Sequence, residues 1–278
     1  MKKTVLFTAA LFAVTAASAQ TGEITSNRGE NWLSQDGDWG LTFDATPLLN
    51  YAGNLFNSGN NTNVARLDNL FGNTNLPPNL NGNQIAIGVK KLMDANTAYR
   101  GQVRIGFGSH KVTTEVADLS AGAAVDAKVE DSQKDGYMAI ELGAGIEKRV
   151  GSTRVVGIYG AMVNLGFGNS KTTNEYGNAL TATNAGPRPT ETKNGSVFGI
   201  GVNAFAGIEW FCAPKISLSG EYTWGLAMSS KGYGSTTTES FVNNSVTSTD
   251  ANTGNKDNKF SIDTGVSGAS IGLNFYFQ

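Results

Sequence analysis

Charged residues recur on the polar side of stretches in which apolar and polar residues alternate. Because successive side chains of a β-strand point to opposite faces, such stretches predict strands with one apolar face and one face that carries these charges. We expect the charged side chains to meet inside a closed sheet as an ion-pair network. The seven predicted members are Arg100, Arg104, Glu141, Glu147, Arg154, Glu209 and Glu221.

Two roles are open for this network. Unpaired charges in a low-dielectric interior are costly, so paired charges would fill and stabilise the inside of the sheet. The alternative is a gated conductance path or a ligand site. The distance of each residue from the nearest short turn, counted in residues, gives its expected depth in the sheet. Arg104, Glu141 and Glu221 fall at one depth. The residues closer to the end with the short turns are Arg100, Glu147, Arg154 and Glu209.

One histidine, His110, follows Ser109 and raises the question of hydrolytic or acyl-transfer chemistry. A nucleophile needs a base within about 3 Å and a third group that orients the base. Adjacent strand residues point to opposite faces, so the pattern favours a histidine at the rim of the sheet without catalysis. With one Cys and one His in the chain, zinc or haem sites built from these residues are excluded, and we expect no cofactor.

Eight alternating stretches position these residues. In the last stretch, Ile271, Leu273, Phe275 and Phe277 share one parity, and the polar parity includes Asn274 and Tyr276. The eight stretches cover residues 38–51, 83–90, 98–110, 136–150, 153–168, 197–211, 215–228 and 267–278.

Short and long connections alternate between these stretches. The short ones are "MDANT", "GS" and "AP". The long ones span residues 51–82, 111–134, 169–195 and 229–258, and we expect solvated, mobile surface loops there, with parts of the fourth extending the flanking strands. Such a chain goes up and down four times, which places both termini and the short turns at one end.

The N-terminus predicts export. Lys2 and Lys3 precede a largely apolar run that ends in the small-x-small triplet at residues 17–19, which is typical of a cleaved secretory signal peptide over 1–19. Residues 20–37 form a polar lead-in, and residues 38–278 form the sheet. The formal net charge of −2, without long runs of either sign, argues against a nucleic-acid partner.

A soluble β-sandwich is the alternative architecture for eight amphipathic strands. A membrane barrel is favoured for two reasons. The polar parity is rich in Gly, Ser, Asn, Arg and Glu, which suits a narrow interior. The apolar parity carries aromatic residues near strand ends, as membrane-interface girdles do; these are Trp39, Tyr99, Phe107, Phe167, Phe198, Trp210, Trp224 and Phe277.

The signal ending "ASAQ", the four strand pairs with long polar connections and the terminal "IGLNFYF" resemble the eight-stranded outer-membrane barrels, the OmpX-like proteins and the barrel half of OmpA-like proteins. The resemblance implies an all-β, antiparallel, up-and-down transmembrane barrel in the outer membrane of a Gram-negative-type cell. It also implies that Ile271, Leu273, Phe275 and Phe277 form a C-terminal signal for the barrel-assembly machinery. Members of the family usually end on the aromatic residue, whereas Gln278 follows it here.

We therefore expect a monomeric, non-catalytic barrel with a structural or surface-contact role in the cell envelope. Its partners would be outer-membrane lipid, the assembly machinery and a surface ligand of unknown identity that contacts the loops. The alternatives are a narrow pore for small solutes or ions and a lipid-modifying enzyme.

Overall fold

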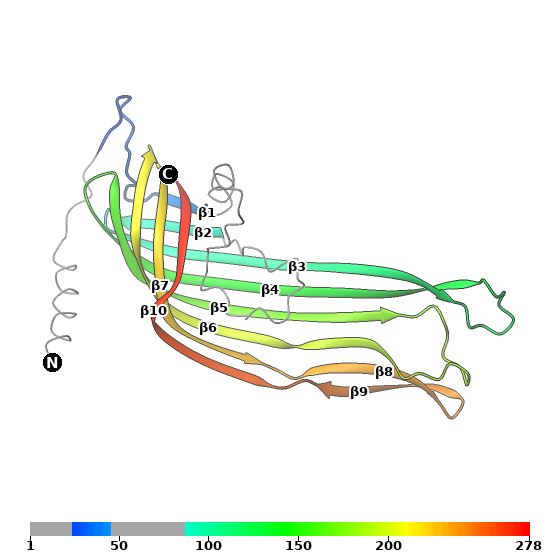
Figure 1. Ribbon diagram of the computed structural model, residues 1–278. Coiled ribbons are helices and arrows are strands. Elements are labelled where there is room, and N and C mark those ends of the chain that lie inside the picture. Colours follow the sequence, from blue (N-terminus) through cyan, green and yellow to red (C-terminus); the bar gives the residue numbers. More distant parts are fainter. Residues whose placement is uncertain (1–23, 46–86) are drawn as a thin grey trace.

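The computed structural model describes residues 24–45 and 87–278, and every helix or strand within them is a β-strand (Figure 1). The strands are β1 (Trp39–Asp44), β2 (Ile87–Asp94), β3 (Thr97–Ala117), β4 (Lys128–Val150), β5 (Val155–Glu175), β6 (Arg188–Ala213), β7 (Ile216–Lys231), β8 (Gly234–Val242), β9 (Ser245–Thr253) and β10 (Asp257–Phe277). No helix in this part of the chain is long and apolar enough to cross a membrane. The expected signal peptide and the first long connection lie outside the described residues.

Eight of these strands form a closed ring. β1 pairs with β2 on one side and with β10 on the other, where Trp39 lies opposite Phe277. From β2 the antiparallel pairing passes through β3, β4 and β5 to β6, and then through β7 back to β10. The predicted antiparallel ring of eight strands is confirmed, and the pairing of β10 with β1 closes it.

The two faces of the ring differ in polarity. On the outside, ladder partners such as Ile105, Ile140 and Phe167 line up across β3, β4 and β5. Ile105 is 65% exposed, whereas the carboxylates of Glu147 and Glu209 on the inner face are 0% exposed. Large apolar side chains thus point outward and charged side chains point inward, the reverse of the usual arrangement in water-soluble proteins.

The short turns β2–β3, β4–β5 and β6–β7 lie at one end of the ring, here called the tight-turn end. An apolar cluster fills the ring there, and Ile24 and Trp32 pack against it. Its members are Leu33, Leu92, Ala98, Val156, Ile158, Phe211 and Tyr276. Val156 and Ile158 interrupt the polar parity of their stretch in the sequence because they belong to this cluster.

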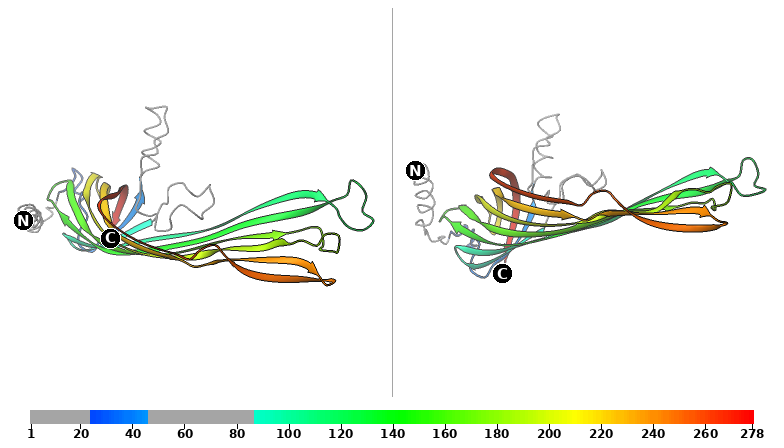
Figure 2. Two further views of the ribbon diagram at one scale, coloured as in Figure 1. Left: turned by 60° about the horizontal axis from the view of Figure 1, so that its bottom comes forward. Right: turned by 90° about the horizontal axis from the view of Figure 1, so that it is seen from below.

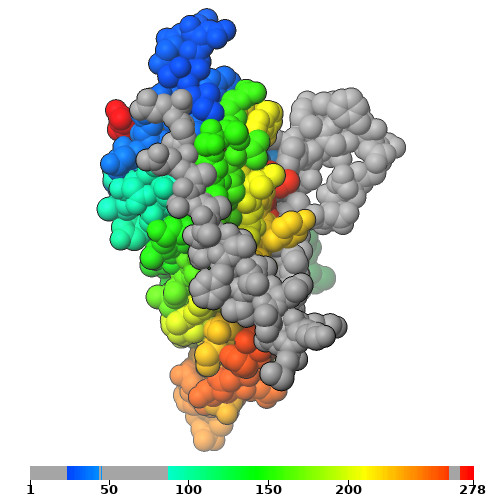
Figure 3. All heavy atoms as spheres, turned by 90° about the vertical axis from the view of Figure 1, so that its left-hand side faces the viewer, coloured from blue at the N-terminus to red at the C-terminus, as the bar shows by residue number. Residues whose placement is uncertain are grey.

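The lead-in expected as a polar segment is partly buried at this end. Within its described residues, 24–37, Leu33 and Ser34 are buried. The backbone N–H of Lys215 donates to the carbonyl oxygen of Trp32, and the Lys215 ammonium pairs with Asp38. In Figure 3, which views the molecule from this side, residues 24–45 lie at one edge, next to the first strands of the ring.

Three of the long connections, which were expected as surface loops with strand extension only in the fourth, consist largely of regular strand. β3 and β4 stay in register from Thr97–Lys148 out to Ala117–Lys128. β6 continues beyond the ring by pairing with the β8–β9 hairpin. Figure 2 shows that these segments leave the ring as one long arm, which we define as residues 109–136, 169–196 and 232–256. Thr-rich runs such as "STTT" favour strands, although the Asn, Ser and Gly content of the connections suggested loops.

The tips of the arm are joined by polar contacts. The Asn178 side chain accepts from the Leu119 backbone N–H (2.7 Å) and donates to the carbonyl oxygen of Ala117 (2.9 Å). The backbone carbonyl oxygen of Asn178 accepts from the Arg188 guanidinium at 2.6 Å. The β3–β4 and β5–β6 tips are therefore held together as one unit.

An ion-paired carboxylate lies on the arm between β5 and β6. Glu191 contacts the ammonium groups of Lys193 (2.7 Å) and Lys171 (3.4 Å). The hydrogen bond from Lys193 lowers the pKa of Glu191 and raises the pKa of Lys193. The outer face of the arm is thus charged and solvated where the outer face of the ring is apolar.

Candidate functional site: the interior charge network

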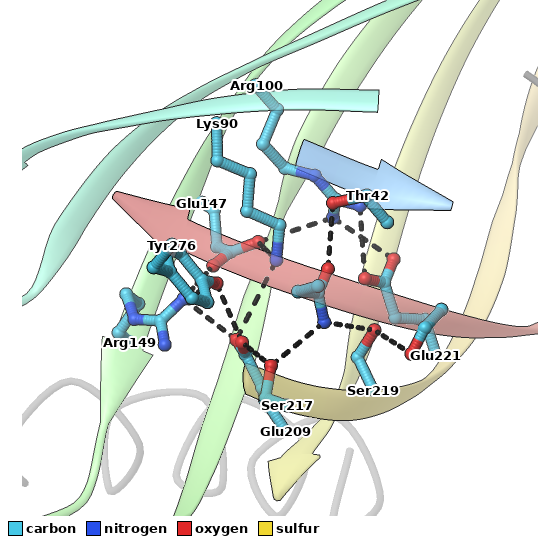
Figure 4. A network of polar contacts seen from close by, with 12 residues as sticks. Thr42, Lys90, Arg100, Glu147, Arg149, Glu209, Ser217, Ser219, Glu221 and Tyr276 are labelled. Carbon is cyan, nitrogen blue, oxygen red and sulfur yellow. Dashed lines mark hydrogen bonds and ion pairs between the residues drawn. The ribbon is translucent and has the colours of Figure 1, made fainter. Parts of the chain in front are cut away.

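Three cations and three carboxylates meet inside the ring near the tight-turn end (Figure 4). They come from β2, β3, β4, β6 and β7, whose inner faces converge there. We call this group the interior network; its charged members are Lys90, Arg100, Arg149, Glu147, Glu209 and Glu221. Their formal charges cancel.

Lys90 and Arg149 each contact both Glu147 and Glu209. The Lys90 ammonium lies 3.0 Å from Glu147 Oε2 and 3.7 Å from Glu209 Oε2. The Arg149 guanidinium lies 2.7 Å from Glu147 Oε1 and 2.9 Å from Glu209 Oε2. All four side chains are at most 1% exposed, so each charge has its counter-charge in the protein and not in solvent.

Arg100 connects the third carboxylate to this group. Its two terminal nitrogens each donate to one oxygen of Glu221 at 3.0 Å, a bidentate pair that fixes the orientation of both groups. The guanidinium also lies 3.5 Å from Glu147 and stacks 4.3 Å from the centre of the Phe205 ring. Arg100 therefore bridges Glu221 on β7 and Glu147 on β4.

Two hydroxyl groups donate hydrogen bonds to Glu209 Oε1. The Tyr276 hydroxyl donates to Glu209 Oε1 at 2.6 Å and accepts from Arg149 at 3.2 Å, and Ser217 also donates to Oε1. The Tyr276 ring has room because Gly40 lies next to it: a Cβ at Gly40 would stand 2.8 Å from a ring carbon. The aromatic ring and the glycine are thus complementary across β1 and β10.

A chain of amide and hydroxyl side chains extends the network to β1, β10 and β7. Thr42 donates to Asn274 at 2.7 Å, and the Asn274 amide donates to Ser217 and Ser219 at 3.1 and 3.2 Å. Farther along the interior, Gln102 donates to Asn164 at 2.8 Å. Side chains from all eight ring strands therefore take part in interior polar contacts.

The structure brings together four of the seven predicted network residues, namely Arg100, Glu147, Glu209 and Glu221. Glu221, which the count from the turns grouped with Arg104 and Glu141, pairs with Arg100. Strands in a closed barrel are tilted and staggered, which means that equal counts from the turns do not reach equal heights.

Arg104 and Glu141 lie directly opposite each other in the β3–β4 register. Gln102 lies between Arg100 and Arg104 on β3, and its amide is 3.5 Å from Glu141 Oε1. Arg104 and Glu141 occupy the interior beyond the network, away from the tight-turn end.

Arg154 does not enter the interior. It is exposed and lies in the turn before β5, with its guanidinium 4.7 Å from the centre of the Trp32 ring. The alternation that predicted an inward side chain applies only from Val155 onward, where the strand begins.

Lys90, Arg149 and Tyr276 are network residues that were not among the seven. The signal for them was present in the sequence, since each falls on the polar parity of its stretch. Parity alone did not show which inward charges come close enough to pair, because that depends on the stagger between strands.

The predicted rim histidine lies on the arm. His110 is opposite Asp135 in the β3–β4 register, and Asp135 accepts from the Thr172 hydroxyl at 2.6 Å. Ser109, its neighbour along the strand, belongs to the opposite face. Ser109 and His110 therefore do not form a nucleophile and base pair. Within the described ranges, no group of three or more His, Cys, Asp or Glu residues gathers as a metal site.

The residues of the expected C-terminal signal lie on the outer face of β10. Phe275 and Phe277 are 37% and 47% exposed, and the Phe43 and Phe275 rings meet edge to face at 6.0 Å. Ile271 and Leu273 continue the same face. Tyr276, between the two phenylalanines, is buried in the interior, as its parity predicts.

No protein-family model and no curated protein matches the chain. The chemistry of the interior network is that of paired charges and hydrogen bonds, which hold strands together.

Proposed function

We propose that the protein is an integral β-barrel of the outer membrane of a Gram-negative-type cell, with a non-catalytic role in envelope structure and surface contact. The observation that carries the proposal is the inverted polarity of the closed ring, with large apolar side chains outside and paired charges inside. In hydrocarbon an unpaired backbone group costs several kcal/mol, and a closed ring leaves none at an edge.

The height of the apolar outer face fits a bilayer. On β5 it runs from Val155 to Phe167, and on β6 from Phe198 to Trp210. A tilted membrane-spanning strand needs about 9–11 residues. Aromatic side chains stand at both limits, as interfacial girdles do; they include Trp39, Trp210 and Phe277 at the tight-turn end and Phe107, Phe167 and Phe198 at the other.

A soluble β-sandwich does not account for this surface. A sandwich buries its apolar face between two sheets, whereas the ring exposes apolar residues along the outer face of every strand. Exposed apolar patches larger than a few hundred Å² are rare on soluble monomers and mark contact with a partner or a membrane. A bilayer contacts all sides of the ring at once.

The narrow pore is the second candidate. Eight-stranded barrels have interiors about filled by side chains, and here the interior network and the apolar cluster occupy the tight-turn end. We expect negligible single-channel conductance for the reconstituted wild-type protein and for Glu141→Ala and Arg104→Ala. A stable conductance that changes with either substitution would favour the pore.

The arm supports the surface-contact part of the proposal, because it extends the sheet far beyond the apolar belt and is polar. Replacing residues 234–253 by a short Gly-Ser link removes β8 and β9 and leaves the β6–β7 and β7–β10 pairings intact. We expect cells that display this variant to lose most of their attachment to host or abiotic surfaces, measured at equal surface amounts of folded barrel. Unchanged attachment would exclude the hairpin as the contact element.

A further inference from the structure

Two charged residues interrupt the apolar outer face of the ring. This face extends from the tight turns to the level of Phe107, Phe167 and Phe198. Among its strand residues whose side chains are described, Lys91 on β2 and Lys148 on β4 are the only charged ones. Both lie near the tight-turn end. They are placed on either side of the same strand, β3.

The register brings the two lysines to one small patch. Lys91 lies opposite Tyr99, and Lys148 lies opposite Thr97, two residues along β3 on the same face. Tyr99 is 52% exposed between them. Trp39, opposite Lys91 on β1, borders the patch on its other side.

Neither lysine has an ionic partner among the residues that the structure describes. The Lys91 ammonium donates to the carbonyl oxygen of Gly37 at 2.6 Å and lies 4.7 Å from the centre of the Trp39 ring. The Lys148 ammonium donates to the Thr97 hydroxyl at 2.7 Å. Among the described residues no carboxylate lies within 4.0 Å of either. Lys90, by contrast, the inward neighbour of Lys91, contacts two carboxylates.

The unused donors of these lysines fit a phosphate group. An ammonium has three N–H donors, and within the described part of the chain one hydrogen-bond acceptor is present for each lysine. The hydroxyls of Thr97 and Tyr99 add neutral polar groups to the patch. Asp94, the exposed last residue of β2, lies opposite Thr97 at the edge of the patch, and its Oδ1 accepts from the Asn96 backbone N–H. Asp36 is exposed in the lead-in.

We propose that Lys91 and Lys148 bind the phosphate of an anionic phospholipid in the leaflet at the tight-turn end. The inference rests on the proposed membrane placement, because a lipid headgroup meets this height of the ring only there. Lysine on a lipid-facing strand is least costly near the interface, and an anionic headgroup supplies the missing counter-charge.

Native mass spectrometry of the refolded barrel, titrated with phosphatidylglycerol or phosphatidylcholine in micelles, tests the inference through the apparent Kd of the first bound lipid. We expect wild type to prefer phosphatidylglycerol by about fivefold for each lysine, the ratio that corresponds to about 1 kcal/mol. The Lys91→Gln/Lys148→Gln variant is expected to bind both lipids equally.

The matched control is Lys111→Gln/Lys128→Gln, which removes the same charge from exposed positions of the arm and is expected to keep the preference. A wild type without preference, a preference that survives in the Lys91/Lys148 variant, or an equal loss in the control would each overturn the site. Full displacement of phosphatidylglycerol by equimolar inorganic phosphate would mean that the site binds a free anion and not a lipid headgroup.

Co-flotation with neutral phosphatidylcholine vesicles separates this inference from the proposed function. A barrel that does not float with these vesicles contradicts the membrane placement and the lipid site together. A barrel that floats and shows no phosphatidylglycerol preference contradicts the lipid site alone. The heat-modifiable migration of folded barrels on gels verifies that each variant is folded.

Discussion

Glu209→Ala is expected to lower the free energy of unfolding of the barrel by about 3–5 kcal/mol, the usual cost of removing one member of a buried ion pair. Glu209 accepts from Tyr276 and Ser217 and pairs with Arg149 and Lys90. Its loss leaves Lys90 and Arg149 with Glu147 alone, a carboxylate that Arg100 also contacts. The interior is closed by the apolar cluster, so solvent does not readily replace the missing counter-charge.

Urea titration of the barrel in phosphatidylcholine vesicles, followed by tryptophan fluorescence, measures this loss. Glu209→Gln retains an oxygen acceptor for Tyr276 and is expected to lose less stability than the alanine variant. The matched control is Glu115→Ala, which breaks the exposed pair with Lys128 and is expected to cost about 0–1 kcal/mol. Equal costs for Glu209→Ala and Glu115→Ala would contradict a stabilising network.

The alternation of residue types was sufficient to predict the ring and the side of each strand that carries charge. Local periodicity determines which face a side chain occupies, so the inward positions of Glu147, Glu209 and Tyr276 followed from parity. The position of Glu221 relative to Arg100 depends instead on the stagger between β3 and β7, which are far apart in sequence. No local pattern contains that stagger.

Two other features depended on tertiary contacts. The lead-in looked polar, yet Leu33 packs with Phe211 and Tyr276 from distant strands. The arm looked like loops because its composition is rich in Asn, Ser and Gly, whereas pairing with neighbouring strands keeps Thr-rich segments such as β8 extended. In both cases distant partners decided the structure of segments whose own preference was weak.

Val163→Arg is expected to destabilise the barrel in a bilayer by about 2–4 kcal/mol, because arginine at mid-depth on a lipid-facing strand must be taken into hydrocarbon. Val163 lies near the middle of the apolar face of β5, with Ala144 and Val202 as its ladder partners. It is 43% exposed. In water, a substitution at such an exposed position would change stability by no more than about 0.5 kcal/mol, so the size of the effect distinguishes the two environments.

Val112→Arg provides the matched control, since Val112 is also a half-exposed strand valine, at 48%, but lies on the arm beyond the apolar belt. Urea unfolding in phosphatidylcholine vesicles should show a large loss for Val163→Arg and almost none for Val112→Arg. Equal, small effects would mean that Val163 meets water, which would contradict the membrane placement. The paired valines thus test the medium around the ring separately from the interior network, because neither side chain contacts it.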